Sequence, residues 1–126
     1  MAKRGAFSGT WKSDKENIMV NLAVILFEED GSQIMYCPAL DVSGYGKTED
    51  EAHDSFNVAL GEFFLYTTRK KTFVGEMERL GWTIRSKHKS MLPPSMSELL
   101  NNNENFSRIF NNFPFRKIDQ PISLPC

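Results

Sequence analysis

The sequence predicts an α+β fold with the element order β-β-β-α-(α)-β, followed by a C-terminal helix and an edge strand. Three observations predict it: an alternating apolar strand that ends in an Asp-Gly turn, a capped helix in the middle of the chain, and a C-terminal third that joins a helical stripe to a proline-containing extended segment. They divide the chain into an N-terminal arm (1–16), a core domain (17–86) and a C-terminal appendage (87–126).

Composition favours one small globular domain in a reducing compartment. Hydrophobic residues make up 40% of the 126 residues and ten are Phe, which is enough to build a core without disulfides. Cys37 and Cys126 are far apart and match neither a disulfide framework nor a metal-site spacing. The net charge of -1 gives no overall attraction to nucleic acid, and no signal peptide or membrane span is recognised. We therefore expect a cytoplasmic protein.

The first strand is expected at Ile18–Phe27, where apolar residues alternate along one face and are frequent on the other. Such a strand lies inside a sheet and is covered on both sides. Asp-Gly turn chemistry in Glu28–Ser32 reverses the chain into a second strand at Gln33–Cys37. Pro38 ends that strand because proline cannot donate a ladder hydrogen bond.

A short third strand, Ala39–Tyr45, leads into the central helix. Gly44 and Gly46 are expected to adopt backbone angles that other residues resist. Thr48 is the predicted N-cap, Glu51 completes a capping box, and acidic residues in the first turn suit the positive end of the helix dipole. The expected buried stripe consists of Ala52, Phe56, Ala59, Leu60, Phe63 and Phe64.

The central helix is expected to close at Arg69–Lys71, whose charge suits the C-terminal end of the helix dipole. A shorter helix follows at Thr72–Leu80 and ends at Gly81, a usual C-cap residue. Trp82–Ile84 is predicted to be a fourth strand that returns to the sheet.

The C-terminal third begins with a second capping-box pattern formed by Ser95 and Glu98. A helical stripe continues from there, and Asn101–Asn103 can break it into two pieces. Phe115–Leu124 is predicted to be extended, and Pro121 confines it to the edge of a sheet.

Short motifs follow one another in a fixed order through the middle of the chain: a strand, an acidic glycine turn, a strand ending in Pro-x-Leu, a glycine-containing bend and a capped Glu-Ala helix. The motifs are Phe27-Glu28, Asp30-Gly31, Pro38-Ala39-Leu40, Gly44, Gly46 and Thr48-x-x-Glu51-Ala52. With them, residues 20–68 resemble the core of the HicB-type antitoxin family, and residues 69–86 resemble it more loosely.

The resemblance implies a partial ribonuclease-H-like fold, a βββαβ core with helices on one face of a mixed sheet. It implies the antitoxin of a type II toxin-antitoxin system, which binds and neutralises a small, basic, HicA-like mRNA-cleaving toxin, and we expect a dimer. The family usually also has a C-terminal DNA-binding module that represses the operon. Operator DNA stays an open partner here, because residues 95–113 offer only Arg108 as a cation. The alternative is an orphan HicB-like structural or regulatory module without a toxin.

No catalytic, cofactor-binding or metal-binding residue is predicted, and we expect neither an enzyme nor a membrane partner. Two-metal nucleases need converging carboxylates on rigid elements, whereas the first strand contains no Asp or Glu before its turn. His53 is expected to be solvated, and Cys37 to be buried by packing. The basic runs at 69–71 and 85–89 could bind nucleic acid or an acidic partner, but solvated ends of a helix and a loop explain them better.

Acidic residues near the turns are the candidate toxin contacts. An RNA-cleaving toxin must be basic to hold RNA, so carboxylates can occupy the same surface by charge complementarity. The candidate contacts are Glu28, Glu29, Asp30, Asp41, Tyr45, Glu49 and Asp50.

Overall fold

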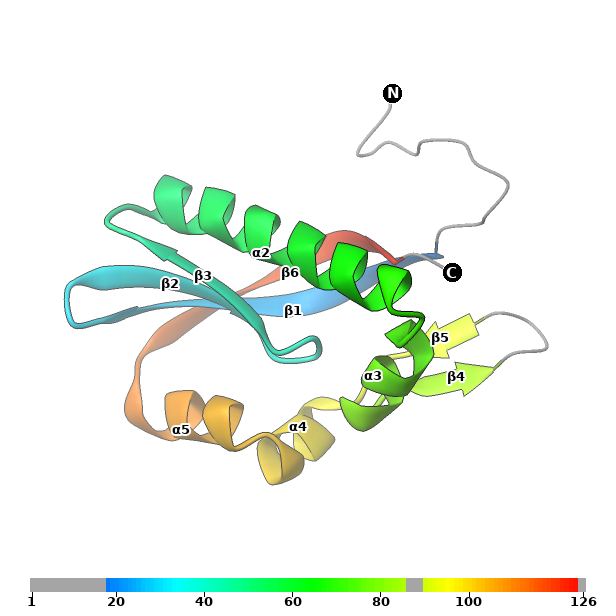
Figure 1. The fold of residues 1–126 in the computed structure, drawn as a ribbon. Helices are drawn as coiled ribbons and strands as arrows, with labels where there is room; N and C mark the ends of the chain where they lie inside the picture. Colours follow the sequence, from blue (N-terminus) through cyan, green and yellow to red (C-terminus); the bar gives the residue numbers. More distant parts are fainter. Residues whose placement is uncertain (1–17, 86–89, 125–126) are drawn as a thin grey trace.

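A four-stranded antiparallel sheet forms the centre of the α+β fold (Figure 1). The computed structural model describes residues 18–85 and 90–124, so the predicted N-terminal arm lies outside the described residues. The strands lie in the order β3-β2-β1-β6. Their bounds are Ile18–Glu29 for β1, Ser32–Cys37 for β2, Val42–Gly46 for β3 and Phe115–Leu124 for β6.

Strand β1 lies inside the sheet and is buried on both faces, as its apolar pattern predicted. Leu22, Val24 and Leu26 enter one core, whereas Ile25 and Phe27 enter a second core on the opposite face. The turn into β2 is also confirmed. Its two central residues, Asp30 and Gly31, have φ angles of 54° and 81°, and positive φ at both positions is the requirement of a type I′ two-residue hairpin turn.

Helices α2 (Glu49–Arg69) and α3 (Phe73–Arg79) pack on the first of these faces. The Thr48 hydroxyl accepts a hydrogen bond from the Glu51 amide at 3.1 Å, as an N-cap should. The Glu51 carboxylate accepts from the Lys47 amide at 2.8 Å, one residue before the position that a capping box would use. The stripe of α2 packs on the core as predicted. Ala52 and Phe56 are fully buried, and the other four residues of the stripe are partly buried.

Two glycines of β3, Gly44 and Gly46, lie against the backbone of α2, and the expectation that they adopt unusual backbone angles is wrong. Neither has a positive φ angle. A Cβ atom on Gly44 would lie 2.1 Å from the Phe56 amide nitrogen, and one on Gly46 would lie 2.3 Å from the Glu51 Cβ atom. These positions therefore exclude side chains because the helix approaches the strand too closely.

The second face of the sheet is covered by α4 (Met96–Asn102) and α5 (Glu104–Asn112) (Figure 1). The expected mixed sheet is wrong, because its strand pairs are all antiparallel. The core helices α2 and α3 lie on one face as expected, and the C-terminal helices, predicted as part of an appendage, cover the other face. The physical reason is that β1 and β2 present apolar side chains on this face too, and burying them requires a second layer. That layer is supplied by Leu99, Phe106 and Ile109.

The expected return of the fourth strand to the sheet is also wrong. Strand β4 (Thr83–Arg85) pairs with β5 (Ser90–Leu92) in a separate two-stranded sheet. The place beside β1 is taken by β6, which pairs with it over ten positions, from Phe27 opposite Phe115 to Ile18 opposite Leu124. The predicted C-terminal edge strand is confirmed, and it completes the sheet of the core.

Candidate functional site

Most of the predicted contact residues gather at one end of the sheet, which we call the acidic end. The hairpin turn closes where Glu29 pairs with Ser32, and Gly46 at the end of β3 pairs with Gln33, so the start of α2 lies at the same end (Figure 1). The acidic end consists of Glu28, Glu29, Asp30, Tyr45, Glu49 and Asp50. Asp41 does not belong to it, because it lies in the β2–β3 connection at the opposite end of β2.

Two arginines from the C-terminal third lie among these acids, which the sequence pattern did not reveal. Arg108 of α5 lies 3.4 Å from the Glu29 carboxylate, and Arg116 of β6 lies 2.6 Å from that of Glu49. Both ion pairs are substantially exposed, so each contributes at most about 1 kcal/mol to stability. Among the described residues, the other three acids of this surface form no ion pair: Glu28, Asp30 and Asp50.

Tyr45 is the large exposed side chain at the acidic end, with 70% of its surface accessible. It points away from α2, because the alternate β3 residues Val42 and Gly44 face that helix. Its backbone amide donates a hydrogen bond to the Ser55 hydroxyl at 3.1 Å, which ties the strand to α2. An exposed aromatic ring on a fixed backbone, at the same end of the sheet as several carboxylates, suits contact with a basic protein partner.

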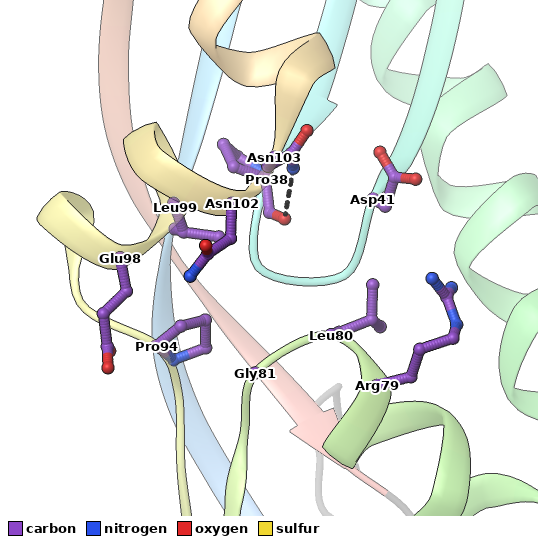
Figure 2. A pocket seen from close by; sticks show the side chains of 10 residues that line it. All are labelled: Pro38, Asp41, Arg79, Leu80, Gly81, Pro94, Glu98, Leu99, Asn102 and Asn103. Carbon is purple, nitrogen blue, oxygen red and sulfur yellow. Dashed lines mark hydrogen bonds between the residues drawn. The ribbon is translucent and has the colours of Figure 1, made fainter.

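A separate cavity of about 290 Å³ lies at the other end of the sheet (Figure 2). The β2–β3 connection, the end of α3 and the helix α4 form its walls, and Asp41 and Arg79 lie on the side opposite Glu98. The lining residues are Pro38, Asp41, Arg79, Leu80, Gly81, Pro94, Glu98, Leu99, Asn102 and Asn103. Charged groups of both signs and two amides equip this cavity for hydrogen bonding to a polar group.

The cavity wall is fixed by a hydrogen-bond network centred on Tyr36. Its hydroxyl donates to the Asp41 carboxylate at 2.6 Å and accepts from the Asn103 amide at 2.9 Å. The same amide donates to the Pro38 carbonyl oxygen at 3.3 Å, and the Asn103 side-chain oxygen caps α5 by accepting from the Phe106 amide. Asn103 therefore ends α4, starts α5 and ties both helices to β2, which confirms the predicted break.

Among the described residues, the cysteine is buried and no cluster of metal ligands is formed. The Cys37 side chain is fully buried, and this burial raises the pKa of its thiol to about 11, which opposes formation of the reactive thiolate. Across residues 18–85 and 90–124, no three His, Cys, Asp or Glu side chains are grouped to hold a metal ion. Within the same part of the chain, no helix is long and apolar enough to cross a membrane.

Alkaline pH is expected to destabilise the fold through Tyr36. Burial, together with its hydrogen bond to Asp41, raises the pKa of the Tyr36 hydroxyl well above its ordinary value of 10.0. The neutral form is therefore favoured in the folded state, so its contribution is complete below pH 10 and is lost as the pH rises toward the folded pKa. The free energy of unfolding should decline more steeply above pH 10, by up to about 1.4 kcal/mol per pH unit from this group.

Urea titrations at a series of pH values from 8 to 11 check this expectation, with Tyr36→Phe as the control. The variant should lose about 1–2 kcal/mol at pH 8, because Asn103 and Asp41 each lose a hydrogen-bond partner. Its decline above pH 10 should be shallower than that of the parent protein, while the contribution of Cys37 is common to both. Equal slopes in the two proteins would contradict the assignment to Tyr36.

A scan against protein-family models, a search of curated proteins and a search of solved structures each found no match. The resemblance to the HicB-type core thus depends on the motifs quoted above.

Proposed function

We propose that this protein is a non-enzymatic antitoxin of the HicB type, which binds and neutralises a small, basic, mRNA-cleaving toxin. The observation that carries the proposal is the acidic end, where carboxylates from two separate segments lie at the same end of the sheet as the exposed ring of Tyr45. The motif order of residues 20–68 supports the same function. Because such a toxin acts on mRNA, the proposed pair works in the cytoplasm.

The chemistry of the acidic end fits the two stages of binding. Unpaired carboxylates attract a basic surface from a distance and accelerate the encounter, which is the contribution that exposed charges make best. Tyr45 then supplies a large apolar area with only two rotatable bonds, so little side-chain entropy is lost when it is buried. Arg108 and Arg116 limit the excess of negative charge there by pairing with Glu29 and Glu49.

Charge reversal at the acidic end should slow association with the toxin. The triple variant Glu28→Lys, Asp30→Lys, Asp50→Lys is expected to lower the association rate by about tenfold at low salt and to weaken its salt dependence. Tyr45→Ala should instead mainly raise the dissociation rate, by roughly tenfold or more. Stopped-flow mixing measures both rates.

A matched control reverses three acids elsewhere, with Glu78→Lys, Glu104→Lys and Asp119→Lys. This control changes the net charge equally but leaves the acidic end intact, so its association rate should stay close to that of the parent protein. Rates that fall equally in the control and in the triple variant would show that net charge matters and the acidic end does not.

The proposal expects a neighbouring reading frame to encode a small, basic, histidine-containing protein, and co-expression with that protein tests the partner. We expect the two proteins to copurify, and we expect this chain to rescue the growth of a host that expresses the toxin. Failure to rescue by a folded protein would reject the antitoxin function and favour the orphan module.

Transcriptional autoregulation is not part of the proposal. Arg108 is the one cation in the sequences of α4 and α5, and it pairs with Glu29 of the sheet. Both helices also bury apolar residues against the sheet. A gel shift with the DNA upstream of the gene is therefore expected to show no specific complex.

A further inference from the structure

The outer face of α2 carries apolar side chains where a surface helix normally carries polar ones. This face is opposite the stripe that packs on the sheet, and three large side chains on it or at its margin are half or more exposed. They are Val58 at 61%, Leu65 at 51% and Tyr66 at 64% accessible surface. Apolar residues gathered on one exposed helix face are a usual mark of a surface that binds protein.

Gly61 lies on the same face, between Val58 and Leu65. A Cβ atom at this position would meet nothing within 4 Å among the described residues, so the fold of one chain gives no reason for a glycine. Glycine in the middle of an exposed helix lowers the stability of that helix relative to alanine. Because glycine has no side chain, the backbone of another helix can approach α2 closely at this point.

The charges along α2 are arranged with opposite signs at its two ends. The first turn contains Glu49, Asp50 and Glu51, and the last turn contains Arg69. On the outer face, Asp54, Val58, Gly61, Leu65 and Arg69 succeed one another at steps of three or four residues, which places them in one row. The row is therefore acidic at its start, apolar in its middle and basic at its end.

We propose that this row binds the same row of a second copy of the chain, with the two α2 helices antiparallel. A two-fold axis between positions 61 and 62 places Val58 opposite the Leu65 of the other copy and Asp54 opposite its Arg69, each pair occurring twice. The two glycines then lie beside the axis, where the helices are closest. The reversed copy of the same helix supplies the complementary charges, whereas a parallel arrangement would place Asp54 against Asp54.

The remaining surfaces of the protein are compatible with this pairing. The inner face of α2 stays packed on β3, where Gly44 and Gly46 fix it. Glu28, Asp30 and Tyr45 lie outside the row, and antiparallel pairing directs the two acidic ends away from each other. The proposed dimer therefore leaves the hairpin and β3 part of each acidic end open, and it does not depend on the proposed function.

Sedimentation equilibrium of the full chain tests the charge pairs. Asp54→Arg and Arg69→Asp should each raise the dimer dissociation constant by about tenfold, because each change creates two like-charge contacts. The double variant should return to near the parent value, and an equimolar mixture of the single variants should form a heterodimer in which both pairs are restored. Glu78→Arg, an exposed acid on α3 and therefore outside the row, is the control and should have little effect.

Gly61 supplies an independent test that separates association from folding. Gly61→Gln should raise the melting temperature of the monomer and raise the dimer dissociation constant, because a side chain is added between the two helices. Gly75→Gln is the matched control, since a Cβ atom there also meets nothing within 4 Å and the residue lies outside the row. It should change the melting temperature alone. A parent protein that is monomeric at its solubility limit, or a double charge variant that fails to recover association, would overturn the proposal.

Discussion

Replacement of Gly44 by alanine is expected to remove a large part of the stability of the fold. The added Cβ atom would lie 2.1 Å from the amide nitrogen of Phe56 and 2.6 Å from the carbonyl carbon of Ser55, and all of these neighbours are backbone. Neither element can yield by rotating a side chain, so α2 and β3 must separate. We expect a loss of about 3 kcal/mol or more, because the fully buried Phe56 ring and the apolar residues around it lose their packing together.

Urea unfolding of Gly44→Ala, followed by circular dichroism, checks this expectation. Gly61→Ala is the matched control, since it adds the same methyl group to an open position of α2 and should stabilise the protein by roughly 0.5–1 kcal/mol. The two variants therefore move stability in opposite directions. A Gly44→Ala protein within 1 kcal/mol of the parent would mean that α2 does not approach β3 as closely as described.

The elements that could be predicted from the sequence are those specified by local chemistry. The alternation of β1, the Asp30-Gly31 turn and the Thr48 cap each depend on neighbours a few residues away, and each is found in the structure. The break between α4 and α5 was predictable for the same reason, because Asn103 caps the second helix through its own side chain.

The elements that could not be predicted depend on partners distant in the chain. Trp82–Ile84 has the composition of a strand, but composition does not say which edge a strand will occupy. In the structure, β6 and not the expected fourth strand pairs with β1. Trp82 is instead buried, and its indole N–H donates a hydrogen bond to the Ala39 carbonyl oxygen at 2.8 Å. The face of the sheet covered by α4 and α5 was missed because the apolar stripes of those helices do not specify which surface they contact.

In the candidate site, too, the parts specified by nearby residues could be predicted and the parts that depend on distant residues could not. The pattern identified the acidic turn and the acidic start of α2, and the register of β2 with β3 brings these segments to one end. The sequence pattern could not reveal that Arg108 and Arg116 lie at the acidic end, since 79 positions separate Arg108 from Glu29. It also grouped Asp41 with the other acids, although this carboxylate binds the Tyr36 hydroxyl at the far end of β2.

Removal of residues 115–126 is expected to abolish cooperative folding. Strand β6 supplies the partner of β1 along ten positions, so its loss exposes the backbone hydrogen-bonding groups of an interior strand. It also removes Ile122 and Leu124 from one core and Phe115 from the edge of the other. Near-ultraviolet circular dichroism and urea unfolding should show no cooperative transition, and the exposed edge should promote aggregation.

Two point variants on β6 keep this expectation testable if the truncated chain is insoluble. Ile122 is 3% exposed, and its replacement by alanine should cost about 2–4 kcal/mol. Ile118 lies on the same strand and is 37% exposed, so the same substitution there should cost roughly half as much or less. Urea unfolding of both variants measures the difference, which arises only if β6 is part of the core sheet. Equal small losses, or a truncated protein with an intact cooperative transition, would mean that the C-terminal third folds apart from the sheet.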